Sequence, residues 1–374
     1  MPKKFFQTKK VAVALSGGVD SSVAAALLKK QGFEVVGFHL MFWKAKENKG
    51  KNKEVKDRVK KIGEVLGVPI KFFDVKENFK TLVKNYFLKE MQSGRTPNTC
   101  VVCNREIKFK FLLEKAKELK CDYLATGHYA RNLNSQSQNF AISKFRNFNI
   151  FRILQAKDKN KDQTYFLWGL KLTHQQWNKI LFPIGEIASK QKVRQIAKDF
   201  NLPTYQTPSS SDACFLGSLD FNFFLREKLG EKKGKIIDKQ GNILGEHLGL
   251  WFYTIGQRKG MGLSGGPYFV VAKDFKKNVL IVSKNEKDLL KKEIKFEDTN
   301  WLSQPKSFPL RAQAKIRYGA PLANCLVYKN KALFTKPQKA PTPGQSIVFY
   351  SSRHSSAGAK AGESAQLLGG GVIT

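Results

Sequence analysis

The string Ser16-Gly17-Gly18-Val19-Asp20-Ser21-Ser22 lies where an apolar strand pattern changes into a helical pattern. Two adjacent glycines permit a tight turn and let the backbone approach an anion closely. The helix that follows offers unpaired N–H groups and a positive dipole end, and the Ser21 and Ser22 hydroxyls add donors. Asp20 is suited to hold a magnesium ion against phosphates. The string therefore predicts a nucleotide phosphate site, although Gly-Gly turns also occur in α/β proteins that bind no nucleotide.

The pattern GxxxxGK[ST] of P-loop kinases and GTPases is absent, which disfavours their chemistry. The complete string instead resembles the signature of the N-type ATP pyrophosphatases, the PP-loop superfamily. Members of that superfamily split ATP between the α and β phosphates and adenylate an oxygen, so that a nucleophile can displace it. The resemblance therefore implies ATP as cosubstrate, together with Mg²⁺.

Cysteines form the second chemical signal. Cys100 and Cys103 are two residues apart, and Cys103 lies at the expected start of a helix, where a helix dipole lowers a thiol's pKa. The spacing alone fits a redox pair or half of a zinc site, but no second ligand pair with zinc spacing is visible. Cys121 and Cys325 are isolated in apolar contexts, which favours buried, inert thiols. Cys214 follows a serine-rich segment. Beside an ATP-activating domain, it and Cys103 suggest that one thiol carries a persulfide and the other resolves it.

Short apolar runs alternate with helical patterns over the first 200 residues, which predicts an open parallel sheet with helices on both faces. From about Gly217 onward, short β-like runs separated by turns predict small β domains. We therefore expect a PP-loop catalytic domain at 1–217, a small central β-rich domain at 218–290 and a C-terminal β-barrel-like domain at 291–374. The expected strands are 10–15, 34–42, 69–75, 122–126, 268–272, 279–282, 312–316 and 346–349; the expected helices are 21–31, 76–91, 105–119 and 189–201.

Composition limits the class of protein. The chain has 374 residues, of which 41% are hydrophobic and 12% aromatic, enough for a folded core. No apolar run approaches the 18 residues of a membrane span, no secretory signal is visible, and the five cysteines suit a reducing cytosol. Lys and Arg number 66 against 30 Asp and Glu, a net charge of +36, which attracts polyanions. A generally lysine-rich composition is an equally good partial explanation.

The whole chain from residue 11 onward resembles the bacterial tRNA-specific 2-thiouridylases. The resemblance rests on strings in a fixed order: SGGVDSS, GRTPNTCVVCNREIKF, ATGHYAR, KDQTYFL, DACFLG, YTIGQRKG, TPGQ and LGGGVI. That family makes 2-thiouridine at the wobble position of certain tRNAs from persulfide sulfur. It implies tRNA as the substrate, a persulfide relay protein or cysteine desulfurase as the donor, no membrane partner, and a cytoplasmic location.

The resemblance also implies roles for individual residues. Cys103 aligns with the nucleophile and Cys214 with the persulfide carrier, so that a Cys103–Cys214 disulfide forms during turnover. The positions matching the ATP site are Ala14, Leu15, Ser16, Gly17, Gly18, Val19, Asp20, Ser21, Gly127 and Leu40, the last after the second strand at an adenine contact. The positions matching tRNA contacts are Asn98, Thr99, Cys100, His128, Lys161, Asp162, Gln163, Arg317, Tyr318 and Gln345; Asp162 also suits the cap of a helix at 163–170.

The chain departs from the family pattern at four places. Leu40 replaces a usual methionine, and Thr99-Cys100 replaces a Pro-Asp or Pro-Cys pair. The segment before Cys214 is serine-rich where a Lys-Asp-Ser-Thr-like run is common, and the stretch 351–366, which we interpret as a hairpin tip, is longer than usual. The predicted function is ATP-dependent 2-thiolation of the wobble uridine. The alternatives are another PP-loop enzyme, either an amide-forming ligase or a different tRNA thiolase, and a non-catalytic RNA-binding protein. An intact SGGVDSS string and two placed cysteines argue against the last of these.

Overall fold

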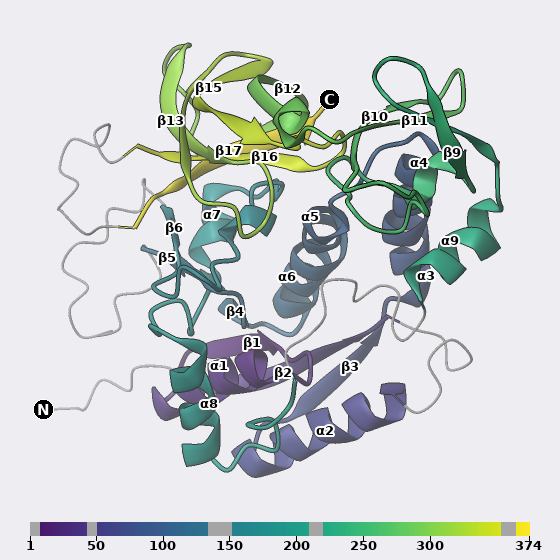
Figure 1. The fold of residues 1–374 in the computed structure, drawn as a ribbon. Helices are drawn as coiled ribbons and strands as arrows, with labels where there is room; N and C mark the ends of the chain where they lie inside the picture. Colours follow the sequence, from purple (N-terminus) through teal and green to yellow (C-terminus); the bar gives the residue numbers. More distant parts are fainter. Residues whose placement is uncertain (1–7, 43–50, 134–151, 209–219, 353–363) are drawn as a thin grey trace, which may run out of the picture. The chain divides into compact units, whose positions relative to one another are not determined.

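The computed structural model describes residues 8–42, 51–133, 152–208, 220–352 and 364–374. Its contacts divide the chain into two compact units (Figure 1). Unit 1 comprises Met1–Lys80, Val101–Cys214 and Lys360–Leu367, and unit 2 comprises Thr81–Cys100, Phe215–Ala359 and Leu368–Thr374. Within the described ranges, none of the helices is both long and apolar enough to cross a membrane.

Unit 1 is built on a five-stranded parallel sheet of order β3-β2-β1-β4-β7. The strands are β1 (Lys10–Ala14), β2 (Glu34–Met41), β3 (Ile70–Asp74), β4 (Tyr123–Thr126) and β7 (Ile180–Leu181). Val11 and Val13 pack into one apolar cluster with α1 (Val19–Lys30), α2 (Lys51–Leu66) and α8 (Lys190–Asp199). Alternation along β1 turns Ala12 to the other face, and α6 (Lys110–Glu118) packs on β1 and β4. The predicted parallel sheet with flanking helices is confirmed.

Two helices differ from the sequence-based expectation because each contains a π-helical turn. The stretch expected as one helix at 76–91 is α3 (Lys76–Phe79), a π turn (Lys80–Lys84) and α4 (Asn85–Gln92). The helix expected at 105–119 begins earlier, with α5 (Thr99–Cys103), and continues through a π turn (Asn104–Phe109) into α6. Such insertions leave the apolar repeat nearly helical, so sequence periodicity does not reveal them.

Shorter elements complete unit 1. Strands β5 (Ala130–Asn132) and β6 (Ile153–Gln155) pair antiparallel, and Thr164–Phe166 forms a single 3₁₀ turn. The helix expected at 163–170 is therefore wrong in extent. Helix α7 (His174–Asn178) begins at a capping box, in which Thr173 and Gln176 satisfy each other's backbone N–H groups.

Unit 2 contains the two β assemblies expected in the second half of the chain. A four-stranded sheet has the order β10-β11-β8-β9, from β8 (Gly234–Ile237), β9 (Ile243–His247), β10 (Phe269–Asp274) and β11 (Val279–Ser283); helix α9 (Phe221–Leu229) precedes it. A closed barrel has the order β12-β15-β14-β13-β16-β17. Its strands are β12 (Leu290–Trp301), β13 (Leu310–Lys315), β14 (Ala323–Val327), β15 (Lys331–Lys339), β16 (Ser346–Ser351) and β17 (Leu367–Ile373). Closure leaves no unpaired strand edge. The stretch expected as a hairpin tip joins neighbouring strands β16 and β17, but 353–363 lie outside the described residues.

Candidate active site

The loop between β1 and α1 has the geometry of an anion site. Gly17 turns the chain at φ +81°, a conformation that side chains disfavour, and α1 then begins at Val19. Among the described residues, no side chain caps this helix start at Gly18. The first N–H groups of a helix have no partner within the helix and carry the positive end of its dipole. The loop therefore presents donors at the carboxyl end of the sheet, where α/β folds bind nucleotides.

Ser21 and Ser22 have different hydrogen-bond partners and different roles in the loop. The Ser21 hydroxyl donates to the Gly18 carbonyl and accepts from the Ser16 N–H, both at 3.1 Å, so it shapes the turn. The Ser22 side chain is fully buried and its hydroxyl bonds to Thr204 at 2.6 Å. The prediction that Ser22 offers a donor to phosphate is therefore wrong, since that hydroxyl belongs to the core.

Gly127 and Leu40 lie on the strands that flank β1. A Cβ on Gly127, just after β4, would stand 2.6 Å from the Ser21 nitrogen, so only glycine allows this approach to the start of α1. Leu40 lies inside β2 rather than after it, and only 8% of it is exposed. Ala14 ends β1, and the N–H of the following Leu15 donates to the Phe38 carbonyl of β2. Residues 14–21 and Gly127 are thus brought together around one loop, and Leu40 lies on the neighbouring strand β2.

Asp20 has two close partners that the sequence analysis missed. Lys190, at the start of α8, places its Nζ 2.6 and 2.7 Å from the two Asp20 carboxylate oxygens. The Tyr129 hydroxyl donates to Asp20 at 2.7 Å, and burial followed by the Asp20 charge raises the pKa of that phenol. The Gln163 side chain in turn accepts from the Tyr129 N–H at 3.0 Å. A continuous network therefore links the KDQ string to the phosphate loop.

This network bears on the chemistry of the site. The Lys190 side chain is 14% exposed and that of Asp20 is 32% exposed, so the ion pair is partly shielded from solvent. A lysine next to a glycine-rich helix start supplies a cation for phosphate oxygens, and a carboxylate there suits Mg²⁺ shared with those phosphates. The N–H groups at the start of α1, the close approach of Gly127 to that start, and this charged pair together suit the phosphates of a nucleoside triphosphate.

Asp162 and His128 are more enclosed than direct RNA contacts would be. Asp162 is 2% exposed; its carboxylate accepts from Gln155 Nε2 at 2.8 Å and from the Thr164 hydroxyl at 2.9 Å. It therefore organises the KDQ turn from within. His128 is half-buried, with its Nδ1 2.9 Å from the Thr126 hydroxyl and its ring 5.5 Å from that of Phe109. Burial, followed by the Lys108 charge, lowers the pKa of His128 to about 3.

The low pKa of His128 predicts acid sensitivity. Between pH 6.5, the usual pKa of histidine, and about pH 3, the unfolded chain binds a proton at His128 that the folded chain excludes. The free energy of unfolding therefore decreases as the pH is lowered, by at most ~1.4 kcal/mol per pH unit. We expect the urea midpoint to drop from pH 7 to pH 5, and His128→Gln to reduce that dependence. His174→Gln, at an exposed position, is the matched control. Equal slopes in all three proteins would contradict the prediction.

The nucleophile candidate does not sit at a helix start. Cys103 is the last residue of α5, which begins at Thr99, and the helical path continues beyond it. The dipole argument therefore fails, because that effect is confined to the first turn. Cys103 is 5% exposed, and its thiol is not bonded to another cysteine among the described residues. The predicted persulfide carrier Cys214 lies outside the described residues.

The remaining expected tRNA contacts divide between the two units. Lys161 and Gln163 belong to unit 1 and are half-buried. Unit 2 holds the base-contact candidates, of which Asn98 and Cys100 are half-buried and Thr99 is 7% exposed. The same unit carries the barrel positions: Arg317 and Tyr318 are exposed just after β13, and Gln345 is half-buried just before β16.

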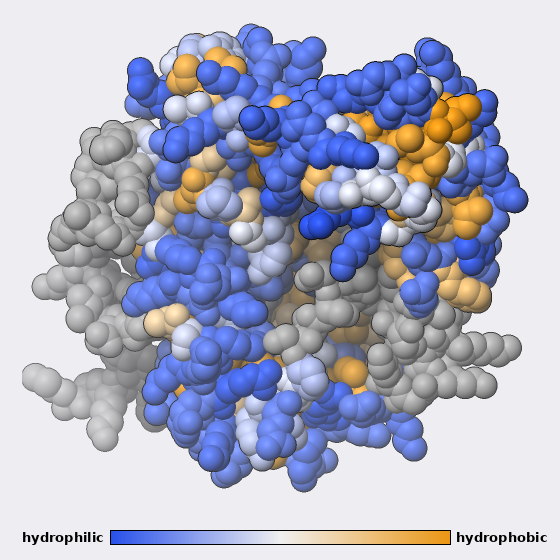
Figure 2. Space-filling model, viewed as in Figure 1, coloured by the Kyte–Doolittle hydropathy of each residue, from blue (hydrophilic) through white to orange (hydrophobic). Residues whose placement is uncertain are grey.

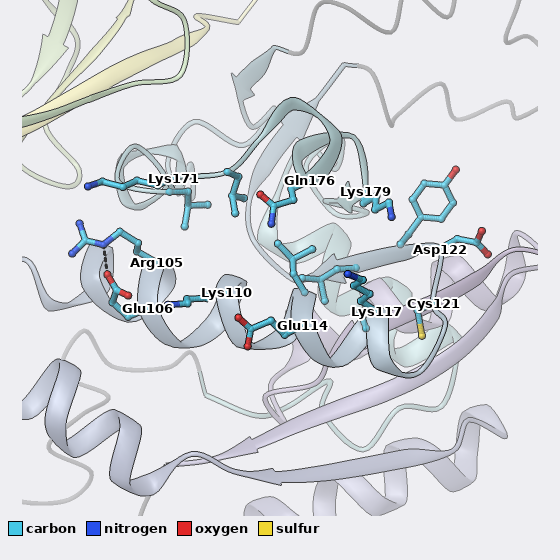
Figure 3. Close-up of a pocket in the computed structure, with 16 residues that line it drawn as sticks. Arg105, Glu106, Lys110, Glu114, Lys117, Cys121, Asp122, Lys171, Gln176 and Lys179 are labelled. Atoms are coloured by element: carbon cyan, nitrogen blue, oxygen red, sulfur yellow. Dashed lines mark hydrogen bonds and ion pairs between the residues drawn. The ribbon is translucent and has the colours of Figure 1, made fainter.

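A cavity of about 550 Å³ in unit 1 lies elsewhere (Figure 3). Its wall includes Lys110 and Lys117 of α6, Lys179, and Asp122 at the amino end of β4. Since the phosphate loop follows the carboxyl end of β1, this cavity is separate from the nucleotide site.

Among the described residues, no group of three or more His, Cys, Asp or Glu side chains could hold a metal ion. Figure 2 shows a largely hydrophilic face, in keeping with the charge of +36.

Comparisons with known proteins agree with this geometry. Family models match residues 9–218 ("tRNA methyl transferase HUP domain"), 222–284 ("tRNA methyl transferase PRC-barrel domain") and 291–373 ("Aminomethyltransferase beta-barrel domain"). The tRNA-specific 2-thiouridylase MnmA of Alkaliphilus oremlandii is 41% identical, covering 91% of this chain and 93% of its own length. The tRNA-specific 2-thiouridylase MnmA of Halothermothrix orenii is 40% identical, and the alignment covers 97% of this chain and 98% of its own length.

The solved structure of the U34-tRNA thiolase NcsA from Methanococcus maripaludis aligns with 61% of this chain and 70% of its own, at 20% identity and a TM-score of 0.34. That score is too low to support an inference about this chain. Identity near 40% over almost the whole length is sufficient and confirms the resemblance drawn from the motifs. The chain belongs to the family of tRNA-specific 2-thiouridylases.

Proposed function

We propose that this chain adenylates the wobble uridine of tRNA with ATP and replaces its O2 with sulfur from a persulfide. The observation that carries the proposal is the phosphate loop, in which an uncapped helix start, Gly127 and the Asp20–Lys190 pair converge. The same unit carries Cys103. A non-catalytic RNA-binding protein would need neither this loop nor that thiol.

In the proposed reaction, the uridine O2 attacks the α-phosphate of ATP and pyrophosphate leaves. The terminal sulfur of a Cys214 persulfide then bonds to C2, and AMP departs with the original oxygen. Cys103 Sγ attacks Cys214 Sγ, so the sulfur–sulfur bond to the terminal sulfur breaks as a Cys103–Cys214 disulfide forms. The two thiols are oxidised and the sulfane sulfur is reduced, which balances the electrons.

The residues of unit 1 would divide the remaining work. The N–H groups at the start of α1 bind phosphate oxygens, and Lys190 neutralises their charge. Asp20 would hold Mg²⁺, which withdraws charge from the phosphates when it is bound. Gln163 and Tyr129 keep the Asp20 carboxylate oriented. Leu40 would pack against adenine, and Asn98, Thr99 and Cys100 would meet the target base.

The proposed partners are tRNA, through its anticodon region, and a persulfide relay protein or cysteine desulfurase in the cytoplasm. Lys161, Arg317 and Tyr318 would contact RNA, with Gln345, Asp162, Gln163 and His128 supporting those contacts. Mass spectrometry of tRNA nucleosides from cells with and without the gene tests the function. Loss of 2-thiouridine supports it, whereas loss of another thiolated uridine would identify a different PP-loop thiolase.

Salt dependence tests the RNA contacts. The logarithm of tRNA affinity should fall with the logarithm of salt concentration, by about 0.7–0.9 for each phosphate contact. Lys161→Ala and Arg317→Ala should weaken binding and reduce that slope by about one unit each, measured by filter binding. Lys198→Ala, an exposed lysine on α8, is the control.

Gln163→Ala should lower turnover more than tRNA affinity, because an uncharged amide releases no counterions and this one holds Tyr129. If the +36 charge acts only as a diffuse field, Lys161→Ala, Arg317→Ala and Lys198→Ala should each lose a small and equal part of the tRNA affinity. That result, with unchanged slopes, would contradict the assignment of Lys161 and Arg317.

A further inference from the structure

The segment Gly94-Arg95-Thr96-Pro97-Asn98 leads into α5 and into the proposed base contacts Asn98–Cys100; we refer to it as the base loop. It forms no helix or strand after Gly94. The base loop belongs to the stretch Thr81–Cys100, which packs within unit 2, whereas the chain up to Lys80 and from Val101 belongs to unit 1. Its supports on the barrel are therefore remote in sequence.

The turn 342–346, which joins β15 to β16 of the barrel, makes three hydrogen bonds with the base loop. The Thr96 N–H donates to the Pro343 carbonyl at 2.8 Å, and Gln345 Nε2 donates to the Thr96 carbonyl at 2.8 Å. The Asn98 side-chain amide donates to the Ser346 hydroxyl at 3.1 Å. Both backbone polar groups of Thr96 are thus satisfied by the barrel, which fixes the path of the chain into α5.

Arg95 ties the same loop to two further elements. Its guanidinium lies 2.9 Å from the Glu297 carboxylate on β12 and 2.8 Å from that of Glu90 on α4. On the side of the four-stranded sheet, a Cβ on Gly94 would stand 2.0 Å from the ring of Phe275. The base loop is therefore held on several sides by unit 2.

Gly344 sets how closely the barrel turn approaches. Its φ is +89°, and an added Cβ would lie 2.9 Å from both the Arg95 Cβ and the Thr96 nitrogen. Any side chain at position 344 must push the base loop away, because the contacted atoms are backbone or next to it. Gly241, in the turn between β8 and β9, has a similar φ of +93° with nothing within 4 Å of its Cβ.

We propose that the barrel is a positioning element for the target base: the turn 342–346 and Arg95 hold the base loop in its productive place. The inference rests on the proposed function, in which Asn98–Cys100 meet the uridine. It assigns the barrel a task in the chemical step as well as in RNA binding. Arg95 and Gly344 are then positioning residues, whose loss misplaces the base contacts.

Single-turnover thiolation at saturating tRNA and ATP tests the proposal. Gly344→Ala should slow it about 10- to 100-fold, since a misplacement of ~1 Å can cost 10²-fold, with tRNA Kd changed less than about twofold. Gly241→Ala introduces a similar backbone strain without the steric clash, so it should lower the unfolding temperature through that strain alone and leave the rate unchanged. Equal rates in the two variants, or a loss confined to tRNA affinity, would overturn the proposal.

A second pair of variants guards against failure to fold. Arg95→Gln and Glu297→Gln should each slow thiolation, and the double variant should lose no more than Arg95→Gln alone, because both break one contact. Additive losses would contradict the role of this ion pair.

Asn98→Ala separates the inference from the function: full activity in that variant would reject the base contact itself. Loss in Asn98→Ala with normal rates in the other variants would reject only the positioning by the barrel.

Discussion

Cys103→Ser should abolish 2-thiouridine formation, with a fall in single-turnover rate on the order of 10³-fold or more, while ATP and tRNA still bind. The reason is that a serine hydroxyl does not attack the Cys214 persulfide at neutral pH, and neither thiol is needed to bind phosphate. Cys214→Ser should have the same effect. The measurement is nucleoside mass spectrometry after one turnover with a persulfide donor.

The other cysteines provide the controls. Burial raises the pKa of the Cys325 thiol to about 12 and raises that of Cys121 above its usual range, so both stay protonated and unreactive. Cys121→Ala and Cys325→Ala should therefore cost stability at most. Peptide mapping after turnover should find Cys103 joined to Cys214. A Cys100–Cys103 disulfide, or full turnover in Cys214→Ser, would contradict the assigned carrier.

The second large effect is expected at Asp20 and Lys190. Asp20→Ala should stop pyrophosphate release, because it removes the candidate Mg²⁺ ligand and leaves the Lys190 ammonium without the carboxylate it contacts at 2.6 Å. Lys190→Met should raise the ATP Kd about 10- to 100-fold, the value of one charge-assisted bond of ~1.5–3 kcal/mol. Isothermal titration with ATP measures the second effect.

Lys192→Met, an exposed position one half-turn further along α8, is the matched control and should bind ATP normally. tRNA binding should survive in all of these variants, because the expected RNA contacts are other residues. Normal pyrophosphate release by Asp20→Ala would remove Asp20 from the phosphate site. An unchanged ATP Kd in Lys190→Met would restrict that lysine to holding the loop.

The sequence predicted the features that depend on neighbours in the chain. The phosphate loop was predictable because Gly17-Gly18 sits between an apolar run and a helical one, and both patterns are local. The parallel sheet followed from the same alternation. The helix start near Cys103 was misplaced, because α5 contributes only about one turn before the π turn.

The partners of Asp20 could not be predicted in the same way. Lys190 is 170 residues away and Tyr129 is 109 residues away, so no spacing rule connects them. Ser22 was misjudged for a similar reason, since its bond to Thr204 spans 182 residues. The string that identifies the loop contains no information about which of its polar groups the core will use. That information depends on tertiary contacts.

The interleaving of the two units has a consequence for how the protein is made. The base loop leaves the ribosome long before its supports on the barrel, because Thr96 bonds to Gln345, which is synthesised 249 residues later. At ~5–20 residues per second, that interval is roughly 12–50 s. During it, Phe87 and Met91 of α4, buried in the finished fold, have no complete unit 2 to pack against. An apolar segment therefore stays exposed during synthesis, and production of this protein should respond to chaperone supply and to the translation speed between residues 96 and 345.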